Sequence, residues 1–81
     1  MPTILRFRGL RVMIYTNDHS PPHVHVIGPG AEARIALGDE SERPWVMTND
    51  GLSRRDVAEA LAEIENRDFL MQRWREIHGD A

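Results

Sequence analysis

The chain has 81 residues, of which 41% are hydrophobic and 28% charged, and its formal net charge is −3. This length supports a single domain, residues 1–81, with one modest core. No apolar stretch approaches the roughly 20 residues that a membrane helix needs, and the amino terminus lacks the features of a secretory signal. We therefore expect a cytoplasmic protein without a membrane partner. With no cysteine in the chain, disulfides and thiolate metal sites are excluded.

Charge is divided unevenly along the chain. Residues 1–38 contain four arginines and two acidic residues, whereas residues 39–81 contain six arginines and eleven acidic residues. Because neutralisation of phosphates supplies most nucleic-acid affinity, the overall acidity does not favour RNA binding. Only the amino-terminal half offers a basic surface for RNA.

The amino-terminal half predicts two consecutive β-hairpins. Arg8-Gly9 separates the first two strands, and the turn residues 28–30 separate the next two. The four predicted strands cover residues 4–7, 10–15, 23–27 and 31–37. Within residues 10–15, alternation places Leu10, Val12 and Ile14 on one face. A short fifth strand is predicted at residues 45–47, with a turn at 49–51, so that residues 1–48 form the sheet.

The carboxyl-terminal part, residues 52–78, is predicted to be helical. Ser53 and Asp56 have the spacing of a capping box. An apolar stripe at helical spacing follows, is interrupted at residues 66–68 and resumes with Leu70 and Trp74. This pattern indicates two helices, or one kinked helix, ending near Gly79. The predicted fold class is a two-layer α+β domain, with a four- or five-stranded antiparallel sheet followed by two helices packed on one face.

Three of the four histidines lie within the run from Asp18 to Val26. The His-x-His step places His23 and His25 on the same face of a strand. One interpretation is a site for zinc or another divalent transition metal, with His19, His23 and His25 as ligands and Asp18 as a fourth ligand or an acceptor behind an imidazole. The alternative is that both strand histidines lie on a solvated face while the valines between them face the core.

A second interpretation of the same region is ribonuclease or hydrolase chemistry without a fixed metal. In that case His23, His25 and Tyr15 exchange protons and Arg11 stabilises negative charge. Arg6, Arg8 and Arg11 would bind the phosphate, although arginines beside a hairpin turn are more often simply solvated. Elsewhere, Trp74 is predicted in the core, Trp45 and Arg34 at the surface, and His78 as a favourable charge at a helix end rather than a metal ligand.

The third interpretation, which the residues favour over the other two, is a partner-binding module without catalysis. The outer strand at residues 4–7 has an unpaired edge that can accept another strand, and the acidic helices can meet a basic partner. A core of this size also gains from homo-oligomerisation.

Several segments together resemble a known family. They are Met1-Pro2-Thr3-Ile4, the turn at residues 6–9, Tyr15 followed by Asp18-His19, the run from Pro21 to Val26, and residues 65–70 leading to Trp74. Together they resemble the bacterial domain of unknown function 4160 family. The resemblance implies no established activity and no catalytic residues. It implies a small protein partner encoded nearby, in a pair that is similar to toxin and antitoxin systems, and leaves open which of the two this chain would be.

Overall fold

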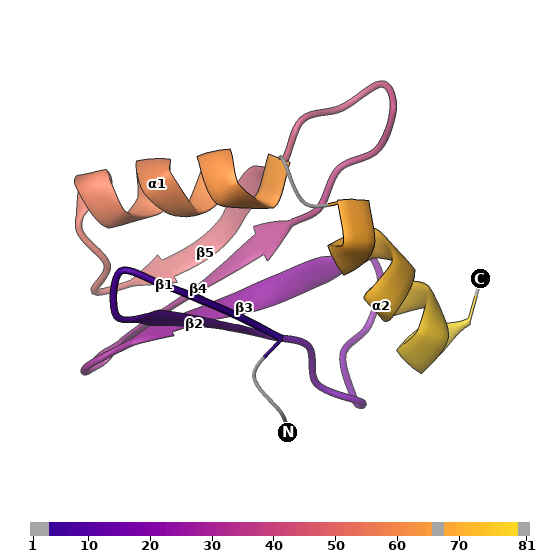
Figure 1. Ribbon diagram of the computed structural model, residues 1–81, viewed down its shortest axis with the longest axis horizontal. Coiled ribbons are helices and arrows are strands. Elements are labelled where there is room, and N and C mark those ends of the chain that lie inside the picture. Colours follow the sequence, from indigo (N-terminus) through magenta and orange to yellow (C-terminus); the bar gives the residue numbers. More distant parts are fainter. Residues whose placement is uncertain (1–3, 66–67, 80–81) are drawn as a thin grey trace.

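The structure is a computed structural model that describes residues 4–65 and 68–79. It contains a five-stranded antiparallel sheet with strand order β1-β2-β3-β4-β5, followed by two helices (Figure 1). The elements are β1 (Leu5–Phe7), β2 (Leu10–Met13), β3 (His23–Gly28), β4 (Ala31–Ala36), β5 (Trp45–Asp50), α1 (Arg54–Glu65) and α2 (Asp68–His78). The predicted α+β class, with two helices after an antiparallel sheet, is confirmed.

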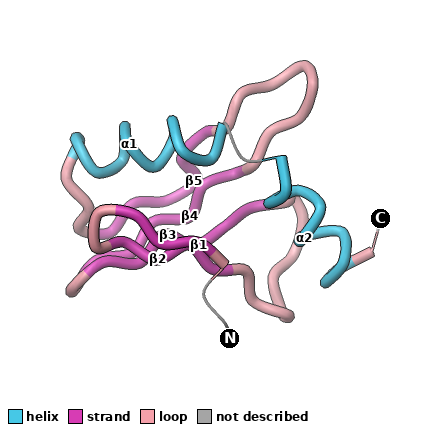
Figure 2. Tube along the Cα trace, viewed as in Figure 1, coloured by secondary structure: helices cyan, strands magenta, loops and turns pink. Residues whose placement is uncertain are grey.

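The first hairpin follows from its turn residues. Arg8 and Gly9 both have positive φ angles, 49° and 78°, as a two-residue hairpin turn requires. The prediction that β2 extends to residue 15 was wrong, because this strand ends at Met13. The backbone N–H of Tyr15 donates to the Asp18 carboxylate instead, at 3.0 Å. The chain therefore leaves the sheet and forms the loop at residues 14–22, drawn in pink between β2 and β3 in Figure 2.

The fifth strand is longer than predicted. Asn49 and Asp50 were predicted to lie in a turn, but they pair with Ala33 and Glu32 of β4 and extend β5 to Asp50. The chain turns afterwards, at Gly51. The Asn49 side chain stabilises this turn by bonding both the N–H and the C=O of Leu52, at 3.0 and 3.1 Å.

The helix boundaries follow from local signals. The Asp56 N–H donates to Ser53 Oγ at 3.1 Å, which confirms the predicted cap of α1. The Gly79 N–H donates to the Arg75 carbonyl at 2.7 Å, and Gly79 adopts a φ of 81° just after α2. The predicted interruption between the helices falls partly on residues 66 and 67, which lie outside the described residues. None of the helices in the described part of the chain is long and apolar enough to cross a membrane.

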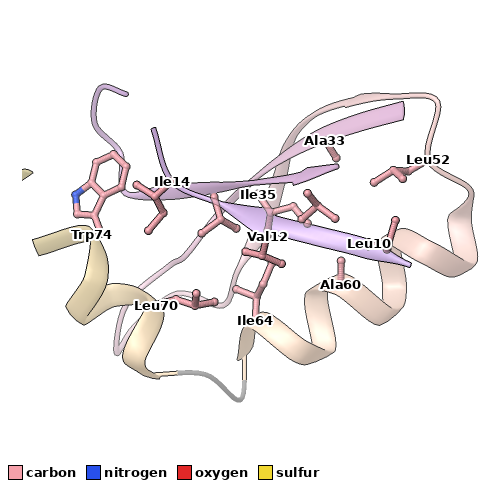
Figure 3. Packing of buried hydrophobic residues seen from close by; sticks show 12 residues of the cluster. Leu10, Val12, Ile14, Ala33, Ile35, Leu52, Ala60, Ile64, Leu70 and Trp74 are labelled. Atoms are coloured by element: carbon pink, nitrogen blue, oxygen red, sulfur yellow. The ribbon is translucent and has the colours of Figure 1, made fainter. Parts of the chain in front are cut away.

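The core lies between the helices and one face of the sheet (Figure 3). Leu10, Val12 and Ile14 face it together, as alternation predicts, and Trp74 of α2 is only 2% exposed. The buried cluster consists of Leu10, Val12, Ile14, Val24, Val26, Ala33, Ile35, Leu52, Ala60, Ile64, Leu70 and Trp74. A fully buried side chain of this kind contributes about 1.5–3 kcal/mol.

The opposite face of the sheet, called the open face here, carries the residues of the other alternation phase. Its first row runs across all five strands as Arg6, Arg11, Ile27, Glu32 and Asp50. The next row, nearer the loop at residues 14–22, runs as Met13, His25, Arg34 and Thr48. The open face is solvated along most of these rows but buried at Met13 and His25. This local burial creates the candidate site.

Candidate metal centre

The loop at residues 14–22 turns Asp18 back toward the sheet. The Asp18 N–H donates to the Tyr15 carbonyl at 3.2 Å, and Asp18 Oδ2 accepts the Tyr15 N–H at 3.0 Å. This reciprocal pair fixes the carboxylate relative to the backbone. As a result, the Asp18 side chain is only 10% exposed and faces the first residues of β3.

His25 lies between two carboxylates. Its Nδ1 is 2.9 Å from Glu32 Oε2, and its Nε2 is 2.9 Å and 3.1 Å from the two oxygens of Asp18. Glu32 reaches the ring from the neighbouring strand β4, on the same face. Each ring nitrogen of His25 therefore faces an oxygen that can only accept a hydrogen bond when ionised.

His23 has one nitrogen with a partner and one without. The Pro21 carbonyl lies 2.8 Å from His23 Nδ1, and since a carbonyl only accepts, Nδ1 must carry the proton. In the neutral ring this leaves a lone pair on Nε2. That atom is buried without a hydrogen-bond partner, 3.5 Å from Asp18 Oδ1. A lone pair that faces a carboxylate in a buried site is unfavourable. Either a cation between the two groups or a proton on Nε2, which would make His23 and Asp18 an ion pair, relieves this contact.

Aromatic rings cover both histidines. The Tyr15 ring lies 4.3 Å from His25 and the Trp74 ring 5.4 Å from His23, measured between ring centroids. His23 and His25 are 3% and 6% exposed. The prediction that they lie on a solvated face was therefore wrong, because the loop at residues 14–22 and helix α2 close over this end of the sheet.

His78 joins these two covering elements. Its ring packs on Trp74 with centroids 4.0 Å apart, and its Nε2 lies 3.1 Å from the Tyr15 carbonyl, to which it donates when protonated. The sequence predicted only a favourable charge at a helix end. It did not predict that His78 would attach α2 to the loop, because Tyr15 and His78 are 63 residues apart.

Burial of the Asp18 carboxylate raises its pKa, but hydrogen bonds from His25 and from the Tyr15 N–H, together with the charges of His25 and His23, lower it more. The net pKa of Asp18 lies below its ordinary value of 3.8. Asp18 therefore remains ionised at neutral pH. An ionised carboxylate is the form that ligates a metal.

The ligand atoms of Asp18, His23 and His25 all lie within 4.8 Å of one another. Two imidazole nitrogens and a carboxylate oxygen around a tetrahedral zinc, at bonds of about 2.0–2.1 Å, are separated by roughly 3.3–3.4 Å. The measured separations from Asp18 Oδ1, 2.9 Å to His25 Nε2 and 3.5 Å to His23 Nε2, approach this spacing. Of the four predicted ligands, the structure brings these three together and leaves His19 exposed, outside the group.

Glu32 is the residue that sequence reasoning missed at this site. Its position in the sequence indicated no role in the site, and its side chain is 48% exposed. The hairpin register nevertheless places it diagonally beside His25 on the same face. The turn at residues 28–30 fixes that register. The alternation of side chains along β3 and β4 could therefore have predicted that Glu32 and His25 lie on the same face.

The predicted arginine group is not assembled around the histidines. Arg8 is at the turn and forms an ion pair with Glu59 of α1, whereas Arg6 and Arg11 are cross-strand neighbours on the open face. Arg11 pairs in register with Ile27, one row away from His25. Of the predicted catalytic set, only Tyr15 joins the two histidines, through ring contact.

The fold and this site define a small α+β domain with a buried aspartate–histidine cluster. The chain belongs to the domain of unknown function family DUF4160, whose model matches residues 9–75. The matched range contains Tyr15, Asp18 and the two clustered histidines. No curated protein and no solved structure shows a significant match to the chain.

Proposed function

We propose that this chain is a metal-binding domain, and that Asp18, His23 and His25 hold a divalent transition metal, with zinc as the best fit. The observation that carries the proposal is the buried Nε2 of His23, which has no hydrogen-bond partner and faces the Asp18 carboxylate. Imidazole and carboxylate ligands suit zinc and its neighbours in the first transition row.

The outer contacts of the two rings support this proposal. Metal-bound histidines usually donate their second N–H to a carboxylate or a backbone carbonyl, which fixes the tautomer and orients the ring. Here His25 Nδ1 faces Glu32 and His23 Nδ1 faces the Pro21 carbonyl. Both Nε2 atoms are thereby directed at Asp18. Without a metal, His25 would instead have to be protonated at both nitrogens between its two carboxylates.

The cover over the site favours a structural role for the metal. A zinc ion there would connect the loop at residues 14–22 to β3, beneath Tyr15 and Trp74. The number of ligands points the other way, because three protein ligands with a fourth position for water are typical of hydrolytic rather than structural zinc sites. The alternative function as a metal- or histidine-dependent ribonuclease through His19, His23 and His25 has less support, because His19 is outside the group and Arg11 is one row away.

The test is the zinc content of the untagged full chain, measured by mass spectrometry after purification without chelator and addition of limiting zinc. We expect about one zinc per chain in the wild type and its loss in His23→Ala and Asp18→Asn. The matched control is His19→Ala, which removes an exposed histidine from the same segment and should keep the metal. Circular dichroism of the variants separates loss of a ligand from loss of the fold.

A graded variant sharpens this test. Glu32→Gln leaves all three ligands in place but replaces the carboxylate behind His25 with a neutral amide. We expect zinc affinity to fall by about 10–100-fold, because outer-shell partners typically contribute that much. The proposal is wrong if the wild type binds no zinc and NMR of the ring nitrogens shows His25 protonated at both positions.

We also propose a second role, partner binding in a two-protein module that is similar to toxin–antitoxin pairs. The observation that favours it is the outer edge of β1, which borders exposed arginines. Partner binding and metal binding are compatible, because strand β2 lies between the outer edge of β1 and the histidines of β3. A pull-down of the adjacent gene product with wild-type chain, and with the edge altered, tests this role.

A further inference from the structure

We infer that the outer edge of β1 binds an extended segment of a partner protein, in which acidic side chains alternate with apolar ones. The segment would pair with β1 as a sixth strand. This inference deepens the partner-binding proposal by naming the surface and the chemistry of the partner. It does not depend on the metal.

The two edges of the sheet differ in how well they can accept a strand. The pairing of β5 contains a register shift at Arg34/Ile35, and such irregularities hinder the addition of another strand. The pairing of β1 with β2 is regular over its whole length. With only three residues, β1 offers few backbone hydrogen bonds to an added strand. A partner there therefore needs side-chain interactions as well.

Arg6 and Arg11 can provide such side-chain interactions on the open face. They are exposed, directly opposite each other, and have no ion-pair partner among the residues that the structure describes. Like charges placed opposite each other on a sheet are unfavourable. Arg8, by contrast, has Glu59 as its partner. The uncompensated pair is therefore complementary to acidic side chains that an added strand would direct to this face.

Hollows border β1 on both faces. On the open face, a hollow of about 590 Å³ includes Arg6, Arg11 and Ile27 in its lining. On the helix side, a hollow of about 280 Å³ lies between β1 and α1, and Phe7 and Ala62 contribute apolar surface to it. Because successive side chains of a strand alternate between faces, an added strand would place acidic residues near the arginines and apolar residues in the smaller hollow.

The same observations argue against two other occupants. A second copy that pairs antiparallel through its own β1, centred on Arg6, would bring further arginines together and increase the repulsion. RNA would supply anionic groups but no apolar side chains for the hollow beside Phe7, and the chain has a net charge of −3. A protein segment with alternating acidic and apolar side chains suits both the arginines of the open face and the apolar hollow beside Phe7.

The experiment is selection of a displayed library of random peptides on the full-length chain, with Arg6→Glu and Arg54→Glu as parallel targets. Both variants make the same charge change at an exposed site, and Arg54, at the start of α1, lines neither of the two hollows beside β1. We expect the wild type and Arg54→Glu to enrich peptides with acidic residues at alternate positions. Arg6→Glu should bind those peptides about tenfold more weakly.

A second measurement locates the bound peptide. Hydrogen exchange of the complex should show new protection of backbone amides in Leu5–Phe7 and no change in β5. Peptides that bind equally well to Arg6→Glu, or that protect β5 or the helices, would refute the β1 assignment while leaving partner binding intact. Failure to enrich any peptide would contradict both the β1 assignment and the partner-binding proposal. Displacement of the selected peptides by short single-stranded RNA would identify the edge as a general polyanion surface and overturn the proposal.

Discussion

Two neighbouring regions of the open face obey the same strand alternation but have opposite environments. In one region His23 and His25 are buried under a loop and a helix, and their nitrogens converge on one carboxylate. In the other region, one row away, Arg6 and Arg11 are exposed and have no ion-pair partner among the residues that the structure describes. The comparison shows that a polar residue on a strand becomes part of a buried site only where another segment covers it.

The largest expected effect comes from removing the cover. Trp74→Ala deletes a core side chain that also packs on His23, and it should lower the free energy of unfolding by about 3–5 kcal/mol. For a small domain with a total stability of about 5–15 kcal/mol, this is a large loss. Chemical denaturation of Trp74→Ala beside Phe69→Ala, an exposed aromatic of the same helix, measures it. Equal losses of unfolding free energy in both variants would show that Trp74 contributes no more to stability than an exposed aromatic residue of the same helix.

The next effect is the pH dependence of stability that comes from the covered histidine region, measured on metal-free protein. The folded state holds the pKa of Asp18 below its ordinary value of 3.8. Its contribution to stability is therefore present above that value and is lost as the pH falls through the lower, folded pKa. Urea unfolding between about pH 5 and pH 2 should show a smaller acid-induced loss in Asp18→Asn than in the wild type.

Asp39 offers a matched control for that measurement. Hydrogen bonds from the Ser41 side chain and backbone also lower its pKa, but Asp39 is fully exposed at the surface. We expect Asp39→Asn to follow the wild-type pH profile more closely than Asp18→Asn does. The reverse order would indicate that the contacts of Asp18 with the histidines do not form in solution.

The smallest effect is expected at the exposed pair Arg6 and Arg11. Arg6→Glu replaces a like-charge cross-strand pair with an attractive Glu–Arg pair and should stabilise the fold by about 0.2–1 kcal/mol. The same substitution weakens the proposed peptide binding, so stability and binding should change in opposite directions. Thermal unfolding at low salt measures the gain, and its disappearance at high salt would confirm the electrostatic origin. A destabilised variant would mean that Arg6 already has a favourable partner.

Local chemistry explains which parts of the fold were predictable. The Arg8-Gly9 turn, the Ser53 cap and the alternation of Leu10, Val12 and Ile14 each depend on residues close in sequence, and all three predictions are confirmed. The extent of β5 was not predictable in this way. Asn49 and Asp50 have turn chemistry, but pairing with β4 keeps them in the strand.

The site was predictable in composition but not in environment. The sequence alone determined that Asp18, His23 and His25 are close together, because the carboxylate and the second histidine are only seven residues apart. It also determined the hairpin that brings Glu32 beside His25. Only the tertiary structure decided that these groups are buried and that His19 is excluded. Burial depends on Trp74 and His78 closing over the loop from the far end of the chain, and no local pattern encodes a contact across that separation.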